Sequence, residues 1–176
     1  MRLRPFHQSD LETLYQIDQA CFPPGVSYSR AELAAFIRHS PGATWIAEEG
    51  KVIVGFLIAD REGKGAAHIV TIDVVEGRRR SGVGKALMDA VEAWATRHGL
   101  GLIHLETAAS NSGAQAFYQA RGYRKLEMIE DYYADGEAAW VMVKSLAKNC
   151  RLPIADWKME NRNSKFETRK KQPENP

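Results

Sequence analysis

A short basic run, RRRSGVGK at positions 78–85, has the residue types that bind an anion. It follows the apolar run IVTIDVV and precedes a segment with helical periodicity. Small residues such as Gly82 and Gly84 let backbone N–H groups approach an anion, and the N-terminus of a helix adds partial positive charge. The sequence therefore predicts an anion-binding turn between a strand and a helix. A solvated charged turn is the alternative.

Two common phosphate-binding motifs do not fit this run. A Walker A loop needs G-x-x-x-x-G-K-[ST], but Gly84 and Lys85 are followed by Ala86, and Arg79 stands where the first glycine belongs. A dinucleotide-binding fingerprint needs a third glycine where this chain has Leu87. These mismatches argue against a nucleoside triphosphatase and against a dinucleotide-binding site.

A second set of polar residues, Glu106, Asn111 and Tyr118, lies in the segment LETAASNSGAQAFYQARGY. Glu106 is near the end of an apolar strand, so we expect partial burial to raise its pKa and to suit it as a general base. Asn111 and Tyr118 are about two helical turns apart, so both are expected to face one ligand. Structural alternatives are a strand carboxylate for Glu106, a helix cap for Asn111 and core packing for Tyr118.

Apolar residues at helical spacing predict four helices that carry or border these residues. The helices are expected at about 10–20, 29–38, 83–98 and 111–121. Ser29 with Glu32 predicts a capping box for the second helix, and Ser112 with Gln115 predicts another for the fourth. Glycines that follow the last two helices are expected to end them.

Alternating and continuous apolar runs predict seven strands. They are expected at 1–6, three times within 44–75, and at 101–108, 123–131 and 137–144. The hairpin-like turns EEGK and REGKG separate the three central strands and predict that these strands are antiparallel. Together the elements predict one α/β domain of the α+β kind over residues 1–147. Residues 148–176 are expected to be a partly disordered extension with a short helix near 154–159.

Composition narrows the class of protein. A chain of 176 residues with 44% apolar and 26% charged residues fits one globular domain. No apolar run approaches the roughly 20 residues of a membrane span, and no signal-peptide core is seen, so a cytoplasmic protein is expected. Cys21 and Cys150 are expected to be reduced thiols. The histidines make no metal-binding spacing and are assigned to surface or core: His7, His39, His68, His98 and His104.

Charge is uneven along the chain. Residues 148–176 carry eight lysines and arginines against four acidic residues, whereas the preceding part is slightly acidic. This small excess is a weak signal for nucleic acid, so binding of nucleic acid is not expected. A tail that acts on RNA or ribosomes is left as an alternative, and the protein is expected to be a monomer or a homodimer.

The two motifs together resemble the GNAT superfamily of acetyl-CoA-dependent N-acetyltransferases. The R-x-x-G-x-G pattern at Arg79–Gly84 is similar to the family's pyrophosphate loop, and residues 105–123 resemble its second cofactor-contacting segment. Glu106, the spacing from Asn111 to Tyr118, and DYYADGEAAWVM resemble the branch that acetylates protein N-termini, including ribosomal-protein alanine acetyltransferases. The chain differs from that branch in CFPPGVSYS and in its basic tail.

This resemblance implies a mixed, mostly antiparallel sheet of about seven strands that splays between strands four and five. Acetyl-CoA would be the acetyl donor, with no metal. The implied catalytic residues are Glu106 as base and Tyr118 as acid. The implied acetyl-CoA contacts are Ile72, Asp73, Val74, Arg79, Arg80, Ser81, Gly82, Val83, Gly84, Lys85, Asn111 and Tyr118.

The acceptor is expected to lie between two loops. The residues that would hold it are Phe22, Tyr28, Tyr132 and Tyr133, with packing roles as the alternative. The expected reaction is direct acetyl transfer to a primary amine, first of all the α-amine of a protein or peptide N-terminus. A small amine such as an amino acid, polyamine or antibiotic is the enzymatic alternative. A non-catalytic acetyl-CoA-binding module is the alternative from another class.

Overall fold

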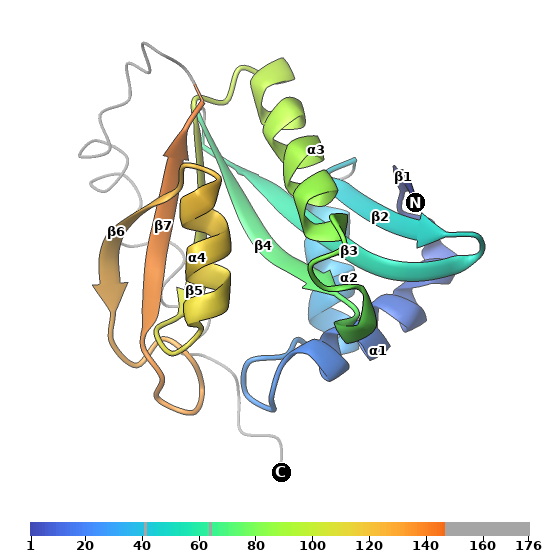
Figure 1. Ribbon diagram of the computed structural model, residues 1–176, viewed down its shortest axis with the longest axis horizontal. Helices are drawn as coiled ribbons and strands as arrows, with labels where there is room; N and C mark the ends of the chain where they lie inside the picture. Colours follow the sequence, from blue (N-terminus) through green and yellow to red (C-terminus); the bar gives the residue numbers. More distant parts are fainter. Residues whose placement is uncertain (41, 64, 147–176) are drawn as a thin grey trace.

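The computed structural model describes residues 1–146 except residues 41 and 64. The predicted extension at 148–176, its short helix and Cys150 lie outside these residues. The described strands form one sheet in the order β1-β2-β3-β4-β5-β7-β6 (Figure 1). The strands are β1 Arg2–Pro5, β2 Thr44–Glu49, β3 Val52–Glu62, β4 Ala66–Val74, β5 Leu102–Ala108, β6 Arg124–Ile129 and β7 Ala139–Ser145. The α-helices are α1 Leu11–Cys21, α2 Arg30–His39, α3 Val83–Arg97 and α4 Ser112–Ala120.

The sheet is antiparallel except where β4 meets β5. These two strands pair in parallel at Ala66 with Leu102, Ala67 with Ile103, and His68 with His104. The pairing ends there, although β4 continues to Val74 and β5 to Ala108. Beyond the last pair, the inner edges of β4 and β5 are therefore not paired with each other, and a widening gap separates them (Figure 1). The expected splayed sheet of seven strands with four α-helices is confirmed for the described residues.

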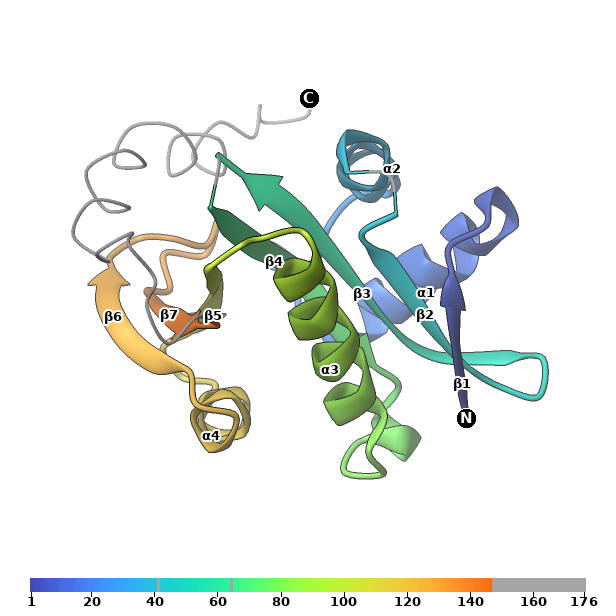
Figure 2. The same ribbon diagram turned by 90° about the horizontal axis from the view of Figure 1, so that it is seen from above.

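Helices cover both faces of the sheet. Figure 2 shows α3 and α4 on one face, with α1 and α2 on the other. Helix α3 buries residues at helical spacing, as the sequence predicts: Val83, Leu87, Met88, Val91 and Ala95. They join the larger core, while α1 packs Leu11, Leu14 and Ile17 into a second core on the opposite face. Within the described residues, no helix has the length and apolar character needed to cross a membrane.

Capping explains where two of the helices begin. Ser29 and Glu32 form the predicted capping box at the start of α2. At α4 the predicted capping box of Ser112 with Gln115 does not form. Asn111, for which a helix cap was the alternative role, is the N-cap, and its side-chain oxygen accepts from the Ala114 N–H at 3.0 Å. The Gln115 amide is used elsewhere, since it donates to two backbone carbonyls of the preceding loop at 2.9 Å. Asparagine is among the most favourable N-cap residues, which explains why Asn111 and not Ser112 caps α4.

A close approach at Gly55 brings α3 onto the sheet next to the splayed strand. A Cβ atom at this position of β3 would lie 2.6 Å from the Asp73 carbonyl oxygen and 3.1 Å from Val83 Cγ1. Both contacts are shorter than ordinary van der Waals distance. A residue without a side chain therefore lets the start of α3 and the end of β4 approach each other.

Candidate active site

A cleft of about 370 Å³ occupies the gap between β4 and β5. Its walls are Ile69–Ile72 of β4 and Leu105–Ala108 of β5, the strand segments that lie beyond the last parallel pair. Asn111, Ala114 and Tyr118 of α4 line it from one side. The cleft therefore results directly from the splayed sheet, and it brings together residues as far apart in the sequence as Cys21 and Glu137.

Two loops complete the cleft. The connection from α1 to α2 contributes Phe22 and Tyr28, and the connection from β6 to β7 contributes Tyr132 and Tyr133. The Tyr28 hydroxyl donates to the Val70 carbonyl at 3.3 Å, which ties its loop to β4. The rings of Tyr132 and Tyr133 meet edge to face with centroids 4.9 Å apart. All four expected acceptor residues thus line one cleft.

Glu106 also lines the cleft, but its electrostatic environment is the opposite of the one expected from sequence. Burial acts to raise the pKa of this carboxyl, and the charges and hydrogen bonds of His68 and His104 outweigh it. The net result is a pKa well below the usual value. The expected raised pKa is therefore wrong, because the sequence placed apolar residues beside Glu106 and did not place two imidazoles there.

The histidines around Glu106 are functional candidates that the sequence analysis missed. His68 Nε2 lies 2.7 Å from Glu106 Oε2, and His104 Nδ1 lies 3.4 Å from Glu106 Oε1. His104 Nε2 in turn lies 2.5 Å from Glu62 Oε2. We call these four residues the Glu62–His104–Glu106–His68 cluster. The available signal was that His104 and Glu106 alternate on one strand, but pairing with His68 depends on strand register.

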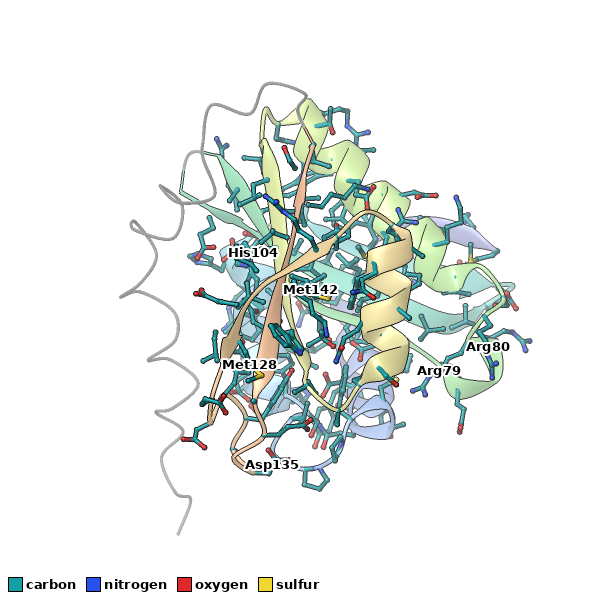
Figure 3. The ribbon with its side chains drawn as sticks, turned by 60° about the vertical axis from the view of Figure 1, so that its left-hand side comes forward. Arg79, Arg80, His104, Met128, Asp135 and Met142 are labelled. Atoms are coloured by element: carbon teal, nitrogen blue, oxygen red, sulfur yellow. The ribbon has the colours of Figure 1, made fainter. Side chains whose placement is uncertain are left out.

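The basic turn lies outside the cleft lining, at the start of α3. Figure 3 shows Arg79 and Arg80 on this turn and His104 on the far side of the sheet. Arg80 has φ of +60° and Gly82 has φ of +93°, so the chain curls tightly before α3. The first N–H groups of a helix have no partner within it, and here they belong to Val83, Gly84 and Lys85. The turn can therefore offer several backbone donors to one anion.

The end of β4 differs in detail from the expected cofactor-facing segment. Ile72 lines the cleft, whereas Asp73 and Val74 do not. Asp73 is 1% exposed, so its carboxyl group is buried and not on the surface of the strand. Burial, with the neighbouring charge of Asp18, raises its pKa well above the usual value, against the hydrogen bond from Thr71 at 3.0 Å. Its Oδ1 has no hydrogen-bond partner among the described residues.

Asn111 and Tyr118 both line the cleft, as their spacing predicts. The oxygen of Asn111 is used by the helix cap, so its amide N–H₂ group is what remains for a ligand. Tyr118 is buried, and burial raises the pKa of its phenol, with the charges of Asp73 and Tyr133 acting in the same direction. Tyr118 is therefore a protonated hydroxyl throughout the neutral pH range, as a proton donor must be.

Cys21 also lines the cleft and is a free thiol, as expected for this cysteine. Burial first, and then the charge of Asp73, raises the pKa of the Cys21 thiol. A raised pKa keeps the sulfur protonated and makes it a poor nucleophile. The cleft is therefore not equipped for a covalent cysteine mechanism.

Comparisons with known proteins agree with this geometry. Residues 11–123 match the sequence profile described as the acetyltransferase (GNAT) family. An uncharacterized N-acetyltransferase of Methanocaldococcus jannaschii is 30% identical over 82% of this chain and 91% of its own. An N-alpha-acetyltransferase of Sulfurisphaera tokodaii is 28% identical over 82% of this chain and 93% of its own. The crystal structure of Ard1 from Thermoplasma volcanium superposes with a TM-score of 0.80 at 28% identity, covering 84% of this chain and 98% of its own.

The chain belongs to the GNAT acetyltransferase family. It is an acyltransferase that uses acetyl-CoA as its donor, and its relatives include proteins named N-alpha-acetyltransferase. The resemblance noted from the two sequence motifs is therefore confirmed.

Proposed function

We propose that this protein transfers the acetyl group of acetyl-CoA to the α-amine of a protein or peptide N-terminus. The observation that carries the proposal is the charge of the cleft. Its lining includes the carboxyl groups of Glu106 and Glu137, but no lysine, arginine or histidine among the described residues. The name of the Sulfurisphaera tokodaii relative supports the same acceptor class.

This charge pattern discriminates between acceptors. A free amino acid carries an α-carboxylate, which needs a cationic partner when it is taken out of water. The first residue of a peptide has its carbonyl in an amide and needs no such partner. A polyamine or a polycationic antibiotic would need several carboxylates, yet Glu137 already accepts from the Ser110 N–H at 2.9 Å. One amine next to one available carboxylate, Glu106, fits a peptide N-terminus best.

The aromatic loops supply the rest of the acceptor site. The rings of Phe22, Tyr28, Tyr132 and Tyr133 would flank the side chains of the first peptide residues, and the hydroxyls of Tyr132 and Tyr133 would face the peptide backbone. Aromatic side chains are well suited to this because they give large contact areas with few rotatable bonds. In this proposal the two loops bind the acceptor, and acetyl-CoA occupies the gap between β4 and β5.

The acetyl-CoA site is proposed from the remaining elements. The backbone N–H groups of the turn Arg79–Lys85 would bind the pyrophosphate, because they lie at the positive end of the α3 dipole. The free edge of β4 at Ile72, Asp73 and Val74 would pair with the amides of the pantetheine arm, as an added strand does. The Asn111 amide would donate to the same arm.

The reaction then needs one base and one acid. The amine nitrogen attacks the thioester carbonyl, its proton passes to Glu106 directly or through one water, and the C–S bond breaks. The Tyr118 hydroxyl protonates the departing thiolate. Proximity of the two substrates in one cleft contributes as well, since positioning alone can supply several kcal/mol, up to about 7–11 in the best cases.

Mass spectrometry of acetylated peptides tests the acceptor. Wild-type protein and Glu106→Gln would each be incubated with acetyl-CoA and a peptide pool that varies in its first residues and contains internal lysines. An identical pool with blocked α-amines, together with free amino acids and spermidine, serves as the matched comparison. We expect acetylation of free α-amines only, reduced by about 10²-fold or more in Glu106→Gln. Acetylation of amino acids or spermidine but not of peptides would replace this proposal with the small-amine alternative.

A further inference from the structure

A buried histidine in contact with two carboxyl groups lies next to Glu106, on the side away from the cleft. His104 lies between two carboxyl groups: Glu62 Oε2 is 2.5 Å from its Nε2, and Glu106 Oε1 is 3.4 Å from its Nδ1. The side chains of His104, Glu62 and Glu106 are only 4%, 8% and 9% exposed. Of these three residues, only Glu106 lines the cleft. An imidazole flanked in this way by two carboxylates is a favourable place for a second proton.

The distances favour one arrangement of protons for a neutral His104. Its contact with Glu62 is the shorter one, so donation from Nε2 to Glu62 leaves the lone pair of Nδ1 directed at Glu106. The 3.4 Å from Nδ1 to Glu106 Oε1 is then the path over which a proton would move. His68 donates from Nε2 to the other carboxylate oxygen of Glu106 at 2.7 Å and fixes its orientation.

We propose that His104 is the final acceptor of the proton that leaves the amine, with Glu106 as the carrier and Glu62 as the fixed counter-charge. The inference rests on the proposed transfer of acetyl to a primary amine. The lone pair of the amine nitrogen forms the new C–N bond, and the C–S bond breaks with its electron pair on sulfur. The amine N–H bond breaks, its electron pair stays on nitrogen, and the proton binds Glu106 Oε1. It then moves from this oxygen to Nδ1 of His104. The product state has a His104 imidazolium between two carboxylates, and a Tyr118 phenolate, because Tyr118 has given its proton to the thiolate. The proton of His104 leaves to solvent and Tyr118 takes one up before the next turnover.

The electrostatics of the cluster support this division of roles. A carboxyl with a strongly lowered pKa, such as Glu106, is too weak a base to hold the proton of an amine whose own pKa is about 7.7–8.0. Burial acts to lower the pKa of His104, but hydrogen bonds and charges from Glu106 and Glu62 outweigh it, so the net pKa is raised. The raised pKa of His104 is closer than the pKa of Glu106 to that of the amine. Proton transfer to His104 is therefore less unfavourable.

Among the residues that the structure describes, few other charged groups lie around His104. On β3, Asp60 is the partner of His68 across the strands, and it is held by the Ser40 hydroxyl. On β6, Arg124 and Glu127 occupy the same cross-strand rows as His104 and Glu106, but one strand farther away, beyond valines of β7. Apart from burial, which acts to lower the pKa of His104, the contributions to this pKa come from Glu106 and Glu62.

A metal ion fits this cluster poorly, although His68, His104 and Glu106 have ligand atoms within 4.8 Å of one another. The two imidazole rings are stacked with an interplanar angle of 13° and centroids 4.5 Å apart. A nitrogen lone pair lies in its ring plane, and zinc binds about 2.0–2.1 Å along it. Two nearly parallel, separated planes do not meet at one such point, so a proton suits this geometry better than a cation.

The pH dependence of acetylation tests the proposal through Glu62→Gln. The variant keeps a polar side chain near His104 Nε2 but removes the charge that stabilises the imidazolium. Because the base must be unprotonated, kcat rises with pH through the pKa of His104. The loss of Glu62 lowers that pKa, so we expect the acidic limb of kcat to move down by about one to two pH units. We also expect the plateau to fall by roughly tenfold, since a weaker base accepts the proton less well.

A second variant and a direct titration complete the test. His104→Gln should lower kcat by about 10²-fold, while acetyl-CoA binding stays at the wild-type level. His98→Gln, at an exposed histidine whose ring contacts the Trp94 carbonyl, is the matched control and should behave as wild type. Nitrogen-15 NMR of the imidazoles should give His104 a pKa above the ordinary value of about 6.5, lowered in Glu62→Gln.

The outcomes separate this inference from the proposed acceptor. An unshifted acidic limb in folded Glu62→Gln, or a His104 pKa that does not depend on Glu62, would overturn the relay even if His104→Gln fails to fold. If the wild type acetylates no peptide, the proposed acceptor is wrong. The NMR titration of His104 then still tests the relay. The pH dependence of kcat would be measured with whichever amine the wild type acetylates.

Discussion

His68 Nε2 and Glu106 Oε2 lie 2.7 Å apart, although 38 positions separate the two residues in the sequence. The contact forms at the last register pair before β4 and β5 separate. It makes Glu106 part of a hydrogen-bonded group at the point where the cleft begins. Groups outside the cleft therefore orient the Glu106 carboxylate and favour its ionised form.

Replacing His68 should impair turnover more than binding. In His68→Gln, Glu106 loses a hydrogen-bond donor that can carry positive charge, and its carboxylate is oriented less firmly. We therefore expect kcat to fall by about tenfold with the KM for acetyl-CoA unchanged. Steady-state kinetics of this variant beside His98→Gln measure the effect. Equal kcat values in the two variants would remove His68 from any role in the reaction.

Stability should depend on pH through Glu106. The folded-state pKa of this carboxyl is lowered, so its contribution to stability is present above the unfolded-state pKa of about 4.3 and is lost as pH falls toward the folded-state value. Glu106→Gln lacks this term and should lose less stability between pH 6 and 3. Urea unfolding across this pH range measures both slopes. A variant that is as acid-sensitive as the wild type would show that Glu106 is not ionised preferentially in the folded state.

Tyr118→Phe should slow the breakdown of the tetrahedral intermediate. The hydroxyl is buried and its pKa is raised, so the wild type should show no basic limb from this group in the neutral range. Loss of the proton donor is expected to lower kcat by about 10²-fold, while acetyl-CoA binding measured by calorimetry stays the same. A large loss of acetyl-CoA binding instead would make Tyr118 a binding residue.

Gly55→Ala should destabilise the fold at the base of the cleft. The added methyl would lie 2.6 Å from the Asp73 carbonyl oxygen, which is backbone and cannot rotate away. Overpacking of this kind costs about 1–3 kcal/mol in the free energy of unfolding. Gly77→Ala is the control, since a Cβ there meets no atom within 4 Å. Similar unfolding midpoints for the two variants would contradict the close approach.

Tyr132→Ala should weaken the acceptor site selectively. Tyr132 lines the cleft from the β6–β7 loop, and its ring packs edge to face on Tyr133. We expect the KM for the peptide to rise by about tenfold, with the KM for acetyl-CoA unchanged, because an aromatic contact of this kind is worth about 0.5–1.5 kcal/mol beyond its buried area. A rise in both values would place the loop on the acetyl-CoA side of the cleft.

Local signals predicted most of the fold. The spacing of Leu87, Val91 and Ala95 defines the buried face of α3, and Ser29 with Glu32 defines the start of α2, because both signals act within a few residues. The failure at α4 was also local. Asn111 and Ser112 compete for one cap, and the choice depends on the backbone conformation of the preceding loop.

The site was predicted less completely than the fold. Phe22, Tyr28, Tyr132 and Tyr133 were expected to share one surface, and they line one cleft. The direction of the pKa shift of Glu106 was wrong, because it is determined by His68 of β4 together with His104 of its own strand. No periodicity in the sequence encodes which residues of two parallel strands lie side by side.

The sequence by itself determined the helices, the strands and the two motifs that identify the family, since each depends on residue type and short spacing. The tertiary structure decided where β4 and β5 separate, and with it the cleft, the burial of Asp73 and the proton environment of Glu106. The physical reason is that register and burial are set by packing of the whole sheet against α1 to α4. Electrostatic shifts follow from distances between side chains that only that packing determines.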